Sequence, residues 1–134
     1  MTTVIALISI AALVAIDQIT KHLVVTNFAI GETMPVWEGV LNFTYVRNDG
    51  AVFGFLSGKG YIFNTVTVLI VLVGIALIVM RKIQPKLLLW AATLVIAGRI
   101  GNLIDLFRLS YVIDFIDVRC FGRFWVWVFN FADC

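Results

Sequence analysis

The chain has 134 residues, of which 62% are hydrophobic and 13% charged, and its formal net charge is +2. A mean hydropathy of +1.05 lies well above the range of soluble domains, and so small a net charge gives no reason to expect a nucleic-acid partner. We therefore predict one membrane-embedded domain over residues 1–134, with membrane lipid around it.

The first apolar segment runs from residue 3 to about residue 25 and predicts a membrane helix, because about 20 residues are needed to cross the hydrocarbon layer. It does not resemble a cleavable signal peptide, since it has no basic residue at its start and continues directly into a polar cluster. That cluster contains Asp17 and Lys21. Their spacing of four places both side chains on one helical face, where they can pair.

An outer β segment is expected next, over about 37–50. Residues 39–46, GVLNFTYV, are rich in β-branched and aromatic side chains, which are typical of a strand. The following RNDG, residues 47–50, is typical of a turn.

Two further membrane helices are predicted over about 61–80 and 87–107. The first of these has no charged residue, whereas the second contains Arg99, Asn102 and Asp105. At 1.5 Å per residue, the polar positions of the third helix reach the same depth as those of the first helix.

Small and polar residues share one face of the third helix. Gly98, Asn102 and Asp105 fall on this face, and Gly98 and Gly101 permit close approach of another helix. One interpretation is that these groups only hold helices together.

The loop between the second and third helices, RKIQPK at 81–86, carries three basic residues in six. Short basic loops stay in the cytoplasm. This predicts a cytoplasmic N-terminus and places residues 26–60 and 108–134 outside.

A second outer β segment is predicted over about 110–131. The runs YVIDFIDV, residues 111–118, and FWVWVFNF, residues 124–131, can form a hairpin with Gly122 in its turn. The expected fold is thus a mainly α-helical membrane protein with three transmembrane helices and a small, outward-facing antiparallel sheet.

Two carboxyls, Asp114 and Asp133, stand at strand-like positions on the outer side. If the strands place them side by side, the two cannot both ionise comfortably and will share a proton, which is the arrangement of aspartic proteolysis. A structural role for both remains the alternative. We expect no metal or other cofactor, because the sequence has no cluster of His, Cys and carboxylate residues to hold one.

Five stretches, in this order and spacing, make the chain similar to the lipoprotein signal peptidase family, signal peptidase II. They are DQITK at 17–21, NFTYVRNDGAVFGF at 42–55, GRIGNLID at 98–105, YVIDFID at 111–117 and FNFAD at 129–133. The resemblance extends over nearly the whole chain.

The resemblance implies a multi-pass protease of the bacterial cytoplasmic (inner) membrane with its active site on the outer face. Its substrate would be a diacylglyceryl-modified prolipoprotein, cut just before the lipid-modified cysteine, and we expect it to act as a monomer. Carried over by motif, Asp114 and Asp133 would be the catalytic pair. The supporting or substrate-binding residues would be Asp17, Lys21, Asn48, Gly50, Asn102, Asp105 and Asn130.

The sequence departs from the family at three points. Leu106 stands where the family usually has Arg, and Arg99 stands where it usually has a small residue. The family continues after the second aspartate into a fourth helix, so we expect that a chain ending at Cys134 is truncated.

Two alternatives remain open. One is an inactive family member that binds signal peptides without cutting them, for which Asp133 would be dispensable. The other is a small transporter that uses Asp17, Arg99 and Asp105 as an ion path.

Overall fold

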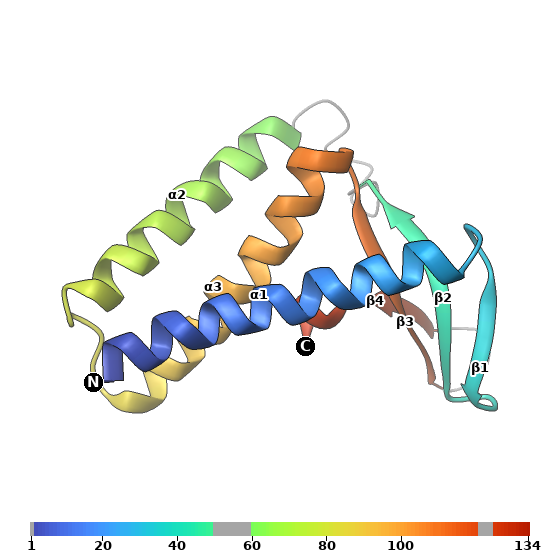
Figure 1. Cartoon of the computed structure of the whole chain (residues 1–134), viewed down its shortest axis with the longest axis horizontal. Coiled ribbons are helices and arrows are strands. Elements are labelled where there is room, and N and C mark those ends of the chain that lie inside the picture. Colours follow the sequence, from blue (N-terminus) through green and yellow to red (C-terminus); the bar gives the residue numbers. More distant parts are fainter. Residues whose placement is uncertain (1, 50–59, 121–124) are drawn as a thin grey trace.

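Three helices and a four-stranded sheet make up the computed structural model, which describes residues 2–49, 60–120 and 125–134 (Figure 1). In chain order the elements are α1 (Thr2–Asn27), β1 (Thr33–Trp37), β2 (Leu41–Asn48), α2 (Gly60–Val79), α3 (Lys86–Leu109), β3 (Val112–Cys120), β4 (Trp125–Phe129) and the 3-10 turn η3 (Phe131–Asp133). The three helices begin and end within two residues of the bounds expected from the sequence.

The helices are apolar and expose much of their apolar surface. Among the described residues, α1 and α3 are long and apolar enough to cross a membrane, and α2 is a helix of 20 residues with an apolar stretch over Asn64–Val79. Side chains such as Ile8, Leu72 and Leu94 are about 60% exposed, which is expected of helices surrounded by lipid rather than water.

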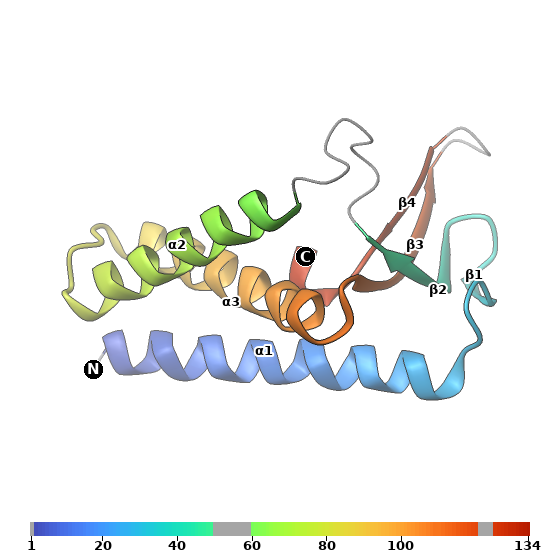
Figure 2. The same ribbon diagram turned by 90° about the horizontal axis from the view of Figure 1, so that it is seen from above.

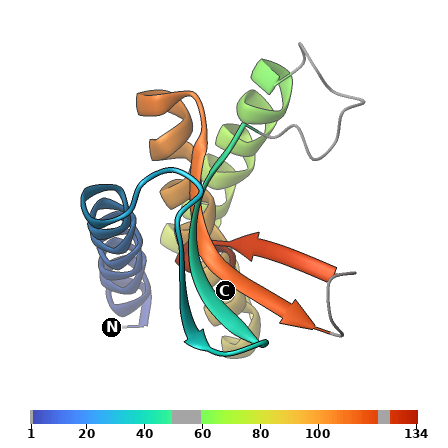
Figure 3. The same cartoon turned by 90° about the vertical axis from the view of Figure 1, so that its right-hand side faces the viewer.

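The sheet is antiparallel throughout, in the order β1-β2-β3-β4, and lies at one end of the helices (Figures 2 and 3). The predicted hairpin of β3 and β4 is confirmed, and its connection, residues 121–124, falls outside the described residues. In the register, Val46 of β2 lies opposite Asp114 of β3, while Asn42 lies opposite Asp117.

Two expectations about the outer segments were wrong, and one strand was missed. The RNDG turn does not begin at residue 47, because β2 continues through Asn48. Residues 33–36 belong to a strand that was not predicted. Its Pro35 lacks an N–H donor, and an edge strand tolerates this loss. Asp133 is not on a strand, since β4 ends at Phe129 and the chain closes into η3.

Two hydrophobic cores are separated by a polar layer. One core lies among the helices and includes Ala6 and Ile10 of α1, whereas the other lies under the sheet and includes Val24 of α1. Between them on the same helix come Asp17 and Lys21, each only 1% exposed. The polar layer is about 22 Å along α1 from Thr2, where the end of α3 and the start of β3 also meet.

Candidate active site

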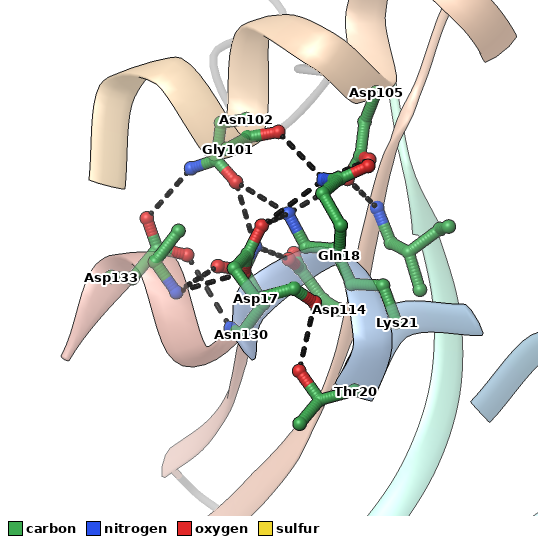
Figure 4. Close-up of polar contacts among 12 residues, drawn as sticks. Asp17, Gln18, Thr20, Lys21, Gly101, Asn102, Asp105, Asp114, Asn130 and Asp133 are labelled. Atoms are coloured by element: carbon green, nitrogen blue, oxygen red, sulfur yellow. Dashed lines mark hydrogen bonds and ion pairs between the residues drawn. The ribbon is translucent and has the colours of Figure 1, made fainter. Parts of the chain in front are cut away.

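A buried ammonium group joins α1 to α3 (Figure 4). The Lys21 Nζ lies 2.9 Å from Asp17 Oδ2 and 2.7 Å from Asp105 Oδ2. It also donates to Asn102 Oδ1 at 2.9 Å. The predicted pairing of Asp17 with Lys21 is confirmed, and the second ion pair adds a link between the helices. Buried charges are costly unless they are paired, so this cluster fixes how the two helices meet.

Two neighbours hold this cluster together. Gly101 of α3 leaves room for the carboxylate of Asp17, because a Cβ at residue 101 would overlap Asp17 Oδ2. Gln18 Nε2 lies 3.1 Å from both Gly101 O and Asp105 Oδ1, and 3.2 Å from Asp17 Oδ2. Gln18 was not among the residues predicted from the sequence, although its position beside Asp17 in DQITK was the available signal.

Asn102 connects the ion cluster to Asp133. Its Oδ1 accepts from Lys21 and from Asn130 Nδ2, the latter at 3.1 Å, while its Nδ2 donates to Asp133 Oδ1 at 3.0 Å. An ammonium group can only donate, so Lys21 determines which end of the Asn102 amide faces it. The other end must then face the Asp133 carboxylate.

Asn130 contacts both candidate catalytic residues. It is fully buried, and its Nδ2 donates to Asp114 Oδ1 at 2.7 Å. Its backbone N donates to Asp133 Oδ2 at 3.4 Å, and its Oδ1 accepts from the backbone N of Ala132 at 2.9 Å. Asn130 thus caps η3 and at the same time joins the two aspartates. The Ala132 N–H also donates to Asp17 Oδ1 at 3.1 Å, a contact that the sequence could not reveal.

Asp114 is a buried carboxyl with an amide donor on each oxygen. Besides the contact with Asn130, its Oδ2 accepts from Asn48 Nδ2 of the adjacent strand at 2.8 Å. Burial raises the pKa of Asp114 above its ordinary value, the two amide donors oppose the increase, and the negative charge of Asp133 adds to it. The neutral form of Asp114 is therefore favoured relative to an aspartate in water.

Asp133 is exposed and borders a cavity of about 230 Å³ between α3 and η3. The cavity extends along α3 past Arg99 to Leu94. Gly98 allows η3 to lie against α3 here, because a Cβ at this position would overlap the carbonyl oxygen of Ala132. The predicted close approach at Gly98 is therefore real, but its partner is η3 and not another helix.

Asp117 belongs to a separate group on the sheet. Its Oδ2 accepts from Thr44 Oγ1 at 2.8 Å and from Arg119 Nη2 at 2.8 Å. Burial opposes its ionisation, but the Arg119 guanidinium and the Thr44 hydroxyl outweigh burial and hold the pKa of Asp117 below its ordinary value. This carboxylate is thus kept ionised as part of the fold.

Most of the residues singled out from the sequence form one hydrogen-bonded network. Asp105 extends it to the sheet, because its Oδ2 accepts from the backbone N of Ile113 at 3.3 Å. Gly50 lies outside the described residues. The members of the network are Asp17, Lys21, Asn48, Asn102, Asp105, Asp114, Asn130 and Asp133.

The chain is similar to known proteins in both sequence and structure. The family model described as signal peptidase (SPase) II matches residues 9–134. A lipoprotein signal peptidase of Syntrophus aciditrophicus is 37% identical over 132 residues, covering 95% of this chain and 81% of the relative. One of Moorella thermoacetica is 42% identical over 122 residues, covering 89% of this chain and 76% of the relative.

A solved structure has the same fold. It is a bacterial membrane enzyme determined by the in meso method at 1.9 Å resolution, with a TM-score of 0.84 and 34% sequence identity. The match covers 96% of this chain and 82% of that chain.

Proposed function

Since this chain belongs to the signal peptidase II family, we propose that it removes signal peptides from prolipoproteins with Asp114 and Asp133 as its two catalytic carboxyls. The observation that carries the assignment is Asn130, a fully buried residue that hydrogen-bonds to both aspartates. Because one residue donates hydrogen bonds to both carboxyls, they are held in the same region of the fold, as a reaction that uses both of them requires.

The two carboxyls have different surroundings, which suggests different roles. Asp133 is exposed beside the cavity and, when ionised, takes a proton from the attacking water. Asp114 is buried, has a raised pKa and gives its proton to the carbonyl oxygen of the scissile bond. When the tetrahedral intermediate collapses, Asp133 passes its proton to the leaving nitrogen, and Asp114 recovers one from the intermediate.

The network behind the aspartates keeps them in position. Lys21 orients Asn102, and Asn102 in turn donates to Asp133 and accepts from Asn130. Amide side chains suit this task, because they hold carboxylates without adding charge to a partly apolar site. The supporting role assigned to these residues by motif is therefore consistent with their contacts.

The membrane placement follows from the helices and the basic loop. The three helices α1, α2 and α3 cross the bilayer, the loop at 81–86 lies in the cytoplasm, and the sheet lies at the outer surface. The apolar part of the signal peptide then lies beside the helices, and the diacylglyceryl chains stay in lipid. One chain contains both carboxyls, so the proposed reaction needs no residue from a second copy, in keeping with the expected monomer.

A transport function is not favoured. Two of the three ionisable groups that it would need, Asp17 and Asp105, are bound to Lys21 rather than facing a path. They also lie at one depth of the bundle.

Cleavage of a diacylglyceryl-modified prolipoprotein peptide by the protein in detergent or lipid tests the proposal. Asp114→Asn and Asp133→Asn should each lower kcat by about 10²–10⁴-fold, because Asn cannot take up or release the proton. Binding of a fluorescent substrate peptide should persist in both variants, and EDTA should leave the wild-type rate unchanged.

The matched control for Asp114→Asn is Asp117→Asn. It is the same substitution in the same strand, β3, at a residue outside the hydrogen-bonded network. It should retain most of the activity at a temperature where it is folded. Loss of cleavage in this control together with full activity of Asp114→Asn would show that the dyad has been assigned to the wrong aspartate.

A further inference from the structure

A second cavity lies at the end of the helices opposite the aspartates. Its volume is about 220 Å³, and residues of all three helices line it. The start of α1 lies beside the loop between α2 and α3 (Figure 1). The floor of the cavity includes Ile78 and Leu89, which are 1% and 8% exposed. A volume of this size is about seven times the share of one water molecule in the liquid, so it accommodates a small polar group.

The walls of this cavity are basic and hydroxylic. Arg81 and Lys86 line it together with Thr2 and Thr3. The salt bridges between described residues involve neither Arg81 nor Lys86. These two cations are therefore available to an outside anion.

No acidic residue lies near these cations along the chain. The sequence has none before Asp17 and none between Asp49 and Asp105. Asp17 itself is about 22 Å along α1 from Thr2 and is bound to Lys21. The cavity thus has a positive field that no internal counter-ion cancels.

The helix ends strengthen this field. Both α1 and α3 begin at the cavity without an acidic residue in the first turn, and the N-cap of α3, Pro85, makes no side-chain hydrogen bond to it. Unpaired N–H groups and the positive end of the helix dipole attract anions.

Arg81 has a left-handed backbone conformation, which residues other than glycine rarely adopt. Its φ is 57°, at a position where helices usually end with glycine. A side chain held in such a conformation suggests a function for that side chain. Its guanidinium can form two parallel hydrogen bonds to a phosphate group.

We propose that this cavity binds the phosphate headgroup of an anionic phospholipid. The floor is apolar, the rim is basic, and the site lies at the level where headgroups meet a helix bundle, which is the combination that selects such lipids. The bound headgroup would link the start of α1 to the loop between α2 and α3. The proposal requires a membrane protein but not the peptidase activity, so the two can fail separately.

Native mass spectrometry of the detergent-solubilised protein tests this site with phosphatidylglycerol and, for comparison, phosphatidylcholine with the same acyl chains. The wild type should retain one phosphatidylglycerol molecule in preference to phosphatidylcholine. Arg81→Gln and Lys86→Gln should each weaken this binding roughly fivefold, and the double variant more, since each cation contributes separately.

Lys82→Gln is the matched control, because Lys82 belongs to the same basic loop but does not line the cavity. It should leave lipid binding almost unchanged. An equal effect of Lys82→Gln and Lys86→Gln would mean diffuse attraction to the loop and would overturn the site. Equal retention of the two lipids, or displacement of the lipid by excess inorganic phosphate, would also contradict the proposal. Far-UV circular dichroism spectra equal to that of the wild type would confirm that the variants fold.

Discussion

At the level of single residues, amide side chains hold the two candidate catalytic aspartates in place. The motifs identified Asp114, Asp133, Asn102 and Asn130 from the sequence, because residue types and spacing are visible there. Which atom of each amide faces which carboxylate was not predictable. For Asn102 that choice depends on Lys21, a donor 81 residues away in the sequence, and for Asn130 it depends on the backbone conformation that brings the N–H of Ala132 to its Oδ1.

Asn48→Ala should shift the high-pH limb of the kcat profile to higher pH. Asn48 donates to Asp114 and so favours its ionised form. Without this donor the pKa of Asp114 rises further, and the proton that Asp114 supplies is retained to higher pH. Thr44→Val removes a donor from Asp117 instead, and it should leave this limb in place.

Asp117→Asn should destabilise the fold by about 1–2 kcal/mol at pH 7, because it breaks buried hydrogen bonds to a charged group. The pKa of Asp117 is lowered from its ordinary 3.8 in the folded protein. Its contribution is therefore complete above that value and is lost as the pH falls through the lowered folded pKa. Thermal unfolding at several pH values should show the two proteins converge in acid, and a constant difference would refute this reading.

At the level of elements, Gly98 and Gly101 of α3 allow close contact with η3 and with α1, so these three elements meet at the site. The helix bounds followed from apolar length alone, and the β3–β4 hairpin followed from β-branched and aromatic residues. The turn η3 could not be predicted, because its conformation depends on the Asn130 cap and on packing against α1 and α3. Strand β1 was missed because it contains Pro35.

Gly98→Ala should lower kcat on the order of 10²-fold, since the added methyl would displace the Ala132 carbonyl and with it the neighbouring Asp133. Gly74→Ala is the matched control. Its Cβ would meet only side-chain atoms of Ile96 and no backbone atom, so the contact does not displace η3. Cleavage rates of the two variants, compared at a temperature where both are folded, check this prediction, and equal rates would contradict it.

At the level of the whole molecule, the protein has a helical part, a sheet part and the polar network between them. The same three layers are met in order along α1, whose buried residues are first apolar, then polar and then apolar again. The depth of the site could thus be estimated from the sequence by counting residues. The orientation across the membrane rests on the basic loop, which charge counting alone identifies.

A cysteine at position 84 should be labelled by a membrane-impermeant maleimide only after the cells are opened. Gln84 lies in the 81–86 loop and is exposed. In the same background, with Cys120 and Cys134 changed to Ser, Glu38→Cys in the turn between β1 and β2 should be labelled in intact cells. The reverse labelling pattern would invert the proposed topology.

In the proposed mechanism, Asp114 and Asp133 act as one coupled acid–base pair. Carbon-13 NMR of the aspartate side-chain carboxyls, titrated in the wild type and in Asp133→Asn, measures this coupling directly. We expect Asp114 to titrate above its ordinary range in the wild type and its pKa to fall in Asp133→Asn, because the neighbouring negative charge is gone. An Asp114 titration that is unchanged by Asp133→Asn would contradict the dyad.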